Sequence, residues 1–165
     1  MPTNSPPSID ALELRAAAPN DDQLLFEIYA SSREIELTLT GWSAEQCAGF
    51  LQHQFLAQQT HYAKYFPAAS NDIIMLAGEP VGRLWVDRTD AEINILDLIV
   101  LTAQRRQGIG GRILERLKEE STRSSLPLHI SVEMGNPSLA YFQRLGFAAI
   151  KENGPHFTLE WKPLT

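Results

Sequence analysis

Cysteine is nearly absent from the sequence, since Cys47 is the only one in 165 residues. One thiol cannot form an internal disulfide, so the composition fits a reducing compartment and we expect a cytoplasmic protein. No apolar run approaches the ~20 residues that a membrane-spanning helix needs. The first eight residues contain three prolines and neither a basic nor an apolar segment. We therefore expect no secretion signal, but a flexible tail over residues 1–9 and one domain over residues 10–165.

Basic residues are also scarce, with 14 lysines and arginines against 20 aspartates and glutamates and a net charge of −6. Proteins that bind nucleic acid usually carry a basic excess, so nucleic acid is excluded as the main partner. The acidic balance is compatible with a cationic substrate such as an amine. We expect no metal cofactor. The hydrophobic content of 44% is ordinary for a globular domain with its own core.

Apolar periodicity predicts strands and helices in an α/β layered domain. The expected strands cover residues 11–16, 73–77, 81–86, 92–101, 128–132, 147–150 and 157–161. The expected helices cover residues 20–32, about 20 residues from position 43, residues 108–124 and residues 136–145. Residues 33–42 alternate like a strand but link two helices, so a strand and a partly helical loop both remain open.

Local signals mark where several of these elements begin. Asn20 with Gln23, and Ser43 with Gln46, each resemble a capping box at a helix N-terminus. The residues 78–80, Gly-Glu-Pro, indicate a hairpin turn. The second helix is expected to bury one face made of Cys47, Phe50, Leu51, Gln54, Phe55 and Gln58.

The most informative stretch covers residues 100–111, V-L-T-A-Q-R-R-Q-G-I-G-G. It leads from an apolar strand through a glycine-rich turn onto an amphipathic helix. The first N–H groups of a helix have no partner within it, and glycine lets an anion approach them closely, so the stretch predicts an anion site. A dinucleotide-binding pattern fails at Ile113, and a P-loop fails because no lysine follows the glycines. A merely tight turn remains the alternative at this point.

A second segment follows at residues 136–147, N-P-S-L-A-Y-F-Q-R-L-G-F. The R-x-x-G-x-G turn at residues 105–110, followed by this helix ending in G-F, resembles the GCN5-related N-acetyltransferase (GNAT) family. The order of elements is similar over about residues 10–162. The resemblance implies a mixed central β-sheet with helices on both faces and a splayed cofactor gap. It also implies acetyl-CoA as co-substrate, and a homodimer, which is frequent in the family.

The resemblance assigns the diphosphate of acetyl-CoA to the backbone amides of the turn, and the pantetheine arm to the end of the preceding strand. The implied cofactor-binding residues are Leu98, Ile99, Val100, Arg105, Arg106, Gln107, Gly108, Ile109, Gly110, Gly111, Asn136 and Phe142. Convergent N–H donors suit a diphosphate, and strand-edge groups suit an amide-bearing arm. Asn136 has a second interpretation as the N-cap of the helix that begins near Pro137, and the two roles are compatible.

The residues for proton transfer depart from the family pattern. Phe142 stands where many members carry a tyrosine that protonates the departing thiolate, and phenylalanine cannot donate a proton. The neighbouring Tyr141 faces about 100° away on a helix, so we do not expect it to substitute. Asn94 and Ser131 stand where other members carry a glutamate base.

Asp97, near the pantetheine strand, and Glu36, in the segment that shapes the acceptor site, are the candidate catalytic carboxylates. Each has a structural alternative, Asp97 as a hydrogen-bonded residue of the sheet and Glu36 as a solvent-facing charge. His61 and Tyr65 are candidates for the mouth of the acceptor site.

We expect an N-acetyltransferase that moves the acetyl group of acetyl-CoA to a primary amine of a small molecule, peptide or protein. The amine would attack the thioester directly, because Cys47 has no histidine-paired context for covalent catalysis. The alternative is a non-catalytic acyl-CoA sensor or regulatory module, which the phenylalanine at position 142 motivates.

Overall fold

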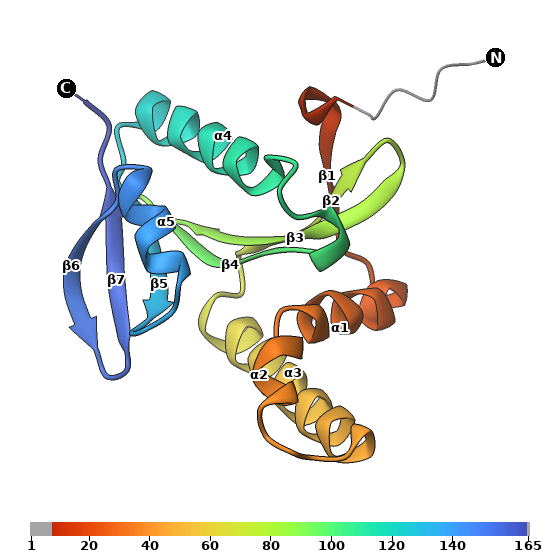
Figure 1. Cartoon of the computed structure of the whole chain (residues 1–165). Helices are drawn as coiled ribbons and strands as arrows, with labels where there is room; N and C mark the ends of the chain where they lie inside the picture. The colour runs from red at the N-terminus through yellow and green to blue at the C-terminus, as the bar shows by residue number, and fades with distance from the viewer. Residues whose placement is uncertain (1–7, 165) are drawn as a thin grey trace.

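A computed structural model describes residues 8–164 and arranges them around one seven-stranded sheet of order β1-β2-β3-β4-β5-β7-β6 (Figure 1). The strands are β1 (Leu12–Ala16), β2 (Ser70–Leu76), β3 (Glu79–Arg88), β4 (Ile93–Val100), β5 (Leu128–Glu133), β6 (Ala148–Asn153) and β7 (His156–Trp161). Strands β4 and β5 pair in parallel and the other neighbours pair antiparallel. The predicted mixed sheet is confirmed.

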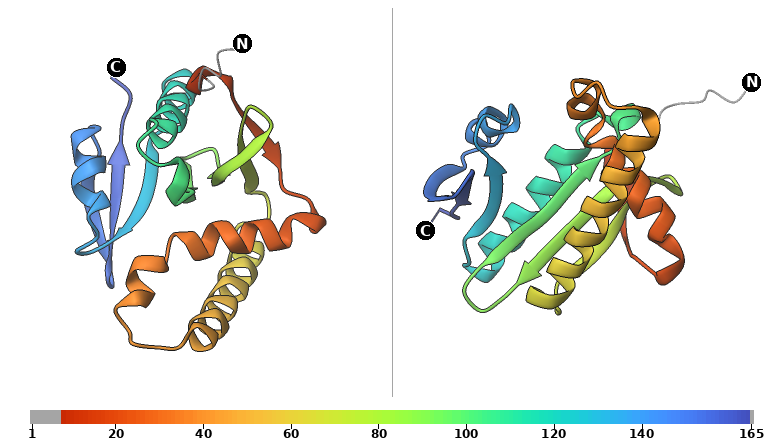
Figure 2. Two further views of the ribbon diagram at one scale, coloured as in Figure 1. Left: turned by 45° about the vertical axis from the view of Figure 1, so that its right-hand side comes forward. Right: turned by 90° about the horizontal axis from the view of Figure 1, so that it is seen from below.

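Helices cover both faces of this sheet, as predicted (Figures 1 and 2). They are α1 (Asp22–Ser31), α2 (Glu34–Thr38), α3 (Ala44–Tyr65), α4 (Ile109–Ser124) and α5 (Ser138–Arg144). Three short 3₁₀ helices lie at Ile9–Ala11, Pro19–Asp21 and Thr102–Gln104. Within residues 8–164, no helix is long and apolar enough to cross a membrane. The predicted tail lies outside the described residues except for Ser8 and Ile9, and Ser8 caps the first 3₁₀ helix.

Two hydrophobic clusters hold the layers together. Helix α4 buries the face that carries Ile109, Ile113 and Leu117 in the larger cluster, against β-strand residues of the sheet. On the opposite face, α1 and α3 pack together through Leu25 and Phe55 in the smaller cluster. Burial of one such side chain stabilises the fold by roughly 1.5–3 kcal/mol, so each helix is fixed mainly by its apolar face.

One of the predicted local signals is confirmed in atomic detail, and a second is confirmed in part. The Ser43 hydroxyl accepts from the Gln46 amide at 3.1 Å, and the Gln46 side chain accepts from the Ser43 amide at 2.9 Å, which completes the capping box of α3. The predicted β2–β3 hairpin is present, but it turns at Ala77 and Gly78, both with positive φ (52° and 81°), and Glu79 and Pro80 of the predicted turn already belong to β3.

Other local predictions were wrong or had been left open. Helix α1 begins at Asp22 and not at an Asn20 cap, because the Asp21 N–H donates to the Ala18 carbonyl at 2.9 Å and closes a 3₁₀ turn first, which the Asp21 carboxylate supports by accepting from the Ala18 amide at 2.8 Å. Phe50 is 41% exposed, since α3 buries Leu51 and Phe55 and leaves Phe50 to pack on Trp42. Of the two alternatives for residues 33–42, the partly helical loop is the one observed, since the short helix α2 covers Glu34–Thr38 and no strand forms there.

Candidate functional site

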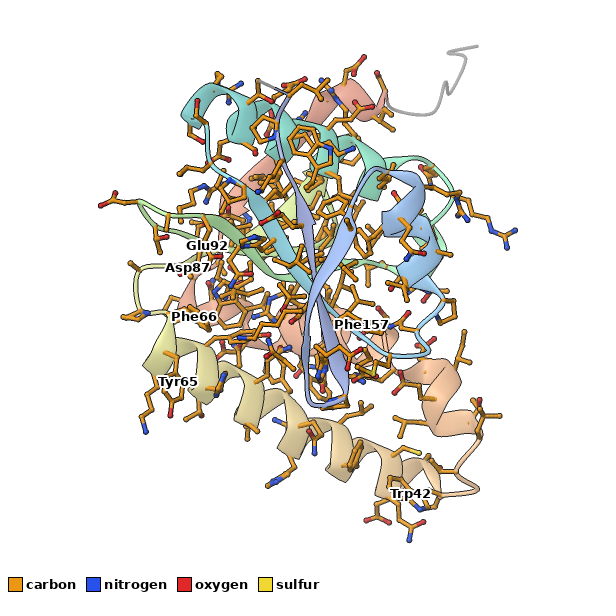
Figure 3. All side chains as sticks on the ribbon, turned by 90° about the vertical axis from the view of Figure 1, so that its left-hand side faces the viewer. Trp42, Tyr65, Phe66, Asp87, Glu92 and Phe157 are labelled. Carbon is orange, nitrogen blue, oxygen red and sulfur yellow. The ribbon has the colours of Figure 1, made fainter. Side chains whose placement is uncertain are left out.

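The central feature of the site is the divergence of β4 and β5. The two strands pair only from Ile93↔Leu128 to Ile95↔Ile130, and both then continue without pairing to each other (Figure 2, right). His129, paired with Asn94 just before the strands separate, has Nε2 2.8 Å from a Glu160 oxygen and Nδ1 in contact with Glu92, which is labelled in Figure 3. The splayed gap expected from the resemblance is therefore present.

A cavity of about 430 Å³ lies between the diverging strands and the helices beside them. This volume is typical of a small-molecule site. The predicted site residues that line it are Glu36, Asp97, Leu98, Ile99, Val100, Gly110, Asn136 and Phe142. The other predicted residues, Arg105, Arg106, Gln107, Gly108, Ile109 and Gly111, belong to the adjoining turn and the start of α4.

The turn before α4 presents backbone rather than side chains. Gly108, in the left-handed conformation at φ 80°, is the N-cap of α4, and the Ile109 side chain is buried in the core. The Arg105 Nε donates to the Val100 carbonyl at 3.2 Å, so this arginine ties the turn to the end of β4. A Cβ placed on Gly110 would find its nearest neighbour at 3.9 Å. The free amides of the first helical turn are thus open to an anion, which fits a diphosphate.

The end of β4 forms the wall next to this turn. A bulge separates the pairs Val86↔Ile95 and Trp85↔Asp97, so Leu96 is the additional residue on β4. The Tyr62 hydroxyl of α3 donates to the Leu96 carbonyl at 3.0 Å. Tyr62 thus stabilises the bulge. Because the bulge directly precedes Asp97, it determines the direction in which the Asp97 side chain faces the cavity.

Asp97 is the most buried carboxylate of the cavity wall. Burial raises its pKa to about 6, against the opposing effect of the Arg83 and Arg33 charges. Its Oδ2 lies 4.0 Å from Nη1 of Arg83, and its side chain retains 17% exposure. A carboxyl group with a pKa near neutrality is suited to accept and release a proton.

Charged side chains from both halves of the molecule surround the outer part of the cavity. Arg33, the N-cap of α2, pairs with Glu36 at 3.2 Å and lies over the ring of Tyr29. On the other side, Glu133 lies 3.8 Å from His156, its register partner on β7. Within residues 8–164 there is no group of His, Cys, Asp and Glu that could hold a metal ion.

The residues of α3 that line the cavity are not the predicted ones. Tyr62 and Gln58, one helical turn apart, line the cavity, whereas His61 and Tyr65 are outside the lining and stack on each other at 4.7 Å. Figure 3 shows Tyr65 near one end of α3 and Trp42 near the other. The i, i+4 spacing of 58 and 62 could have identified this face, since Gln58 already belonged to the face expected to be buried.

Helix α5 supplies the remaining wall. The Asn136 Oδ1 accepts from the Ser138 amide at 2.9 Å, but the N-cap residue of α5 is Pro137, one position later than predicted. Phe142 is 7% exposed and packs edge-to-face on Phe147. Tyr141 also lines the cavity, with its hydroxyl 3.6 Å from where a Cβ of Gly111 would lie.

Sequence reasoning missed several residues that come together here from distant segments. They are Tyr29, Arg33, Tyr62, Glu133, His156 and, behind the wall, Arg83. Arg83 had a visible signal, as a single charge inside the apolar run of residues 81–86, and Tyr62 had one in its i, i+4 spacing from Gln58. The other residues give no such signal, because only the register of β5 with β7 and the packing of α1 against α3 bring them to the cavity.

The chain is similar to one known family and to several solved structures. The model of the acetyltransferase (GNAT) domain family matches residues 38–161. No curated protein matches significantly. Among solved structures, PaiA N-acetyltransferase from Thermoplasma acidophilum in complex with coenzyme A has a TM-score of 0.69 at 14% identity, over 92% of this chain and 99% of that chain.

Two further structures show the same fold. An acetyltransferase from Thermus thermophilus has a TM-score of 0.68 at 24% identity, over 93% of this chain and 97% of that one. A GNAT family acetyltransferase from Elizabethkingia anophelis with acetyl-CoA bound has a TM-score of 0.60 at 15% identity, over 93% and 99%.

Proposed function

The chain belongs to the GNAT acetyltransferase family, and we propose that it transfers the acetyl group of acetyl-CoA to a primary amine. The observation that carries the proposal is the position of the buried carboxylate of Asp97, on the wall of a cavity that ends at the open amides of the α4 N-terminus. The cavity thus joins an anion site to a proton acceptor. Structures of the same fold hold coenzyme A or acetyl-CoA, which supports acetyl-CoA as the donor.

In this proposal, the amides from Arg106 to Gly111 bind the diphosphate, and the unpaired edge of β4 at residues 98–100 binds the pantetheine arm. Asn136 and Phe142 border the arm from α5. Backbone N–H groups at the end of β4 would polarise the thioester carbonyl as it becomes an oxyanion.

The chemistry is a direct displacement. The amine nitrogen forms a bond to the acetyl carbon, the carbon–sulfur bond breaks, and the electron pair leaves on the thiolate of coenzyme A. Asp97 takes a proton from the amine, which must be neutral to attack. Because Phe142 has no acidic proton, water or the substrate ammonium protonates the thiolate.

The acceptor is proposed to be a cationic amine. Glu36, Asp97 and Glu133 line the cavity. Arg33 is paired with Glu36 and Arg83 lies behind Asp97, so among the described residues Glu133, beside His156, has no lysine or arginine partner. A positively charged acceptor would balance this excess of carboxylates. A cytoplasmic location and a homodimer stay predictions.

Thiol release from acetyl-CoA tests the proposal, measured over a panel of polyamines, amino acids, aminoglycosides and peptides. We expect turnover with at least one cationic amine, and Asp97→Asn should lower kcat by about 10²–10⁴-fold because it removes the base. The exposed Asp90→Asn is the matched control and should leave the rate unchanged. Equal rates for the two variants would rule out Asp97 as the base.

A non-catalytic acyl-CoA sensor is the second candidate, and Phe142 in place of a proton donor favours it. Calorimetry with acetyl-CoA separates the two functions. Tight binding together with no thiol release across the whole panel would favour the sensor, whereas no binding would exclude both functions.

A further inference from the structure

Arg83 is a charged residue in the interior of the protein. Its side chain is fully buried on β3, and it is the largest fully buried side chain of the described residues. Two neutral partners hold it: Nε donates to Asn71 at 3.1 Å and Nη2 donates to Gln59 at 2.7 Å. The guanidinium carbon also lies 4.2 Å from the ring centre of Trp85.

Burial of an unpaired guanidinium is costly, so a partner charge is expected nearby. Nη1 is the nitrogen that neither Asn71 nor Gln59 binds, and it lies 4.0 Å from Oδ2 of Asp97. Neither of these two atoms has a hydrogen-bond partner among residues 8–164. The pair is therefore a charge contact without a direct hydrogen bond.

The separation of 4.0 Å has a chemical consequence. An arginine charge within about 4–6 Å commonly lowers the pKa of a carboxyl group by about one to three units, and a direct hydrogen bond would lower it further and make Asp97 a weak base. At the observed distance, Arg83 offsets only part of the effect of burial, and the pKa of Asp97 stays at about 6. Asn71 and Gln59 hold the guanidinium from two sides and so restrict its approach to the carboxylate.

We propose that Arg83 is a positioning residue, whose charge, held inside the sheet by Gln59 and Asn71, keeps the Asp97 carboxylate ionised and available to the cavity. The inference rests on the proposed function, since Asp97 is the base of the transfer. Arg83 does not line the cavity, so it acts through Asp97 without contact to either substrate.

Other groups also face Asp97 and must be separated from Arg83 in a test. Tyr62 faces it from α3, and burial and Asp97 both raise the pKa of Tyr62, so this phenol is neutral at neutral pH. Gln58 contacts Asp97 from the same helix. Arg33 acts from the start of α2, but it is partly exposed and already paired with Glu36, so solvent and Glu36 weaken its effect.

The test compares Arg83→Met with Arg83→Lys and with Gln59→Leu. With Arg83→Met, the acid limb of kcat/KM should move to higher pH by about one unit or more, because the largest effect that opposes burial is then removed and only Arg33, the Leu98 amide and Gln58 still oppose it. The KM for acetyl-CoA should stay within about twofold. Arg83→Lys should restore part of the shift. Gln59→Leu removes one support without removing the charge, so the guanidinium can approach the carboxylate more closely and the limb should move to lower pH.

Two readouts separate a positioning role from a merely structural one. Carboxyl ¹³C NMR of Asp97 in the free protein should show the same upward shift of its titration in Arg83→Met, without any turnover. If Arg83→Met fails to fold, the pH profile of kcat/KM and the NMR titration of Asp97 are measured on Gln59→Leu instead. An unchanged Asp97 titration in a folded variant overturns the inference and leaves the proposed function standing. A shifted titration in a protein that acetylates no amine overturns the base role and the proposed function together.

Discussion

His129 Nε2 lies 2.8 Å from a carboxylate oxygen of Glu160, and its Nδ1 contacts Glu92. The imidazole thus joins Glu160 of β7 to Glu92, the residue before β4, beside the three residue pairs that hold β4 and β5 together. Burial alone would lower the pKa of His129, but hydrogen bonds to Glu160 and Glu92 outweigh it and raise the pKa above its usual value. Hydrogen bonding to His129 in turn lowers the pKa of Glu160.

This contact predicts pH-dependent stability. A group whose pKa is raised by folding stabilises the protein fully below its unfolded pKa, about 6.5 for histidine, and the stabilisation is lost as the pH rises through the folded value. Glu160, with a lowered pKa, contributes above about pH 4.5. Urea unfolding should show wild type more stable than His129→Gln by about 1–2 kcal/mol near pH 6, with the difference shrinking by about pH 9. The exposed His53→Gln should show no such trend. A difference that grows with pH would contradict the assignment.

Gly82 of β3 lies directly against β4, the strand proposed to bind the pantetheine arm, and leaves no room there for a side chain. A Cβ at this position would lie 2.2 Å from the Ile99 carbonyl oxygen, so Gly82→Ala must move the backbone of β3 or β4. We expect a loss of about 1–3 kcal/mol in the free energy of unfolding, together with a higher KM for acetyl-CoA, because Ile99 belongs to the proposed pantetheine wall. Gly49→Ala, in α3 with nothing within 4 Å, is the control and should be neutral or stabilising. Unaltered stability and KM in Gly82→Ala would show that the strand pair adjusts freely.

Several elements were predictable because their signals are local. The Ser43–Gln46 capping box depends on two side chains three residues apart, and the Gly78 turn on two backbone conformations. Likewise, a strand, a glycine turn and an amphipathic helix in series were enough to predict the strand β4, the turn and the helix α4 that border the cavity, where we propose the diphosphate site. In each case the determining contacts lie within a few residues of chain.

The acceptor end could not be predicted in the same way, because its contacts are long-range. Arg83 meets Asp97 only through the β3–β4 register and its bulge, and Tyr62 reaches Leu96 across 34 positions of sequence. Phe50 has the spacing of a buried residue, yet it remains exposed beside Trp42. Periodicity indicates which face a helix can bury, but tertiary packing decides how much of it is covered.

Tyr141 and Phe142 are adjacent residues of α5 that both border the cavity, and only Tyr141 carries a hydroxyl. Because this hydroxyl lies against the first turn of α4 at Gly111, we expect it to contribute to binding of acetyl-CoA and not to protonation of the thiolate. Steady-state kinetics of Tyr141→Phe should show a KM for acetyl-CoA raised severalfold with kcat nearly unchanged. If kcat instead falls by about a hundredfold or more, Tyr141 is the general acid. Phe142→Leu serves as the control for packing on α5.

The glycines at the start of α4 allow folding and binding to be separated. At Gly110 and Gly111 an added Cβ would have its nearest neighbours at 3.9 and 3.6 Å, which are ordinary contacts, so alanine fits both positions. Since alanine favours a helix over glycine, each substitution should raise the free energy of unfolding by up to about 1 kcal/mol. The same methyl group would stand between the amides and a diphosphate, so the Kd for acetyl-CoA should rise about tenfold, or about 1.4 kcal/mol.

Calorimetry beside urea unfolding measures these two effects of the alanine substitutions separately. Gly49→Ala shares the helical gain in stability but lies in α3, away from the turn, and should leave the Kd for acetyl-CoA unchanged. If alanine at Gly110 and Gly111 stabilises the fold and the Kd is equally unchanged, the diphosphate does not lie on this turn, because a methyl group there could not then stand between the ligand and the amides.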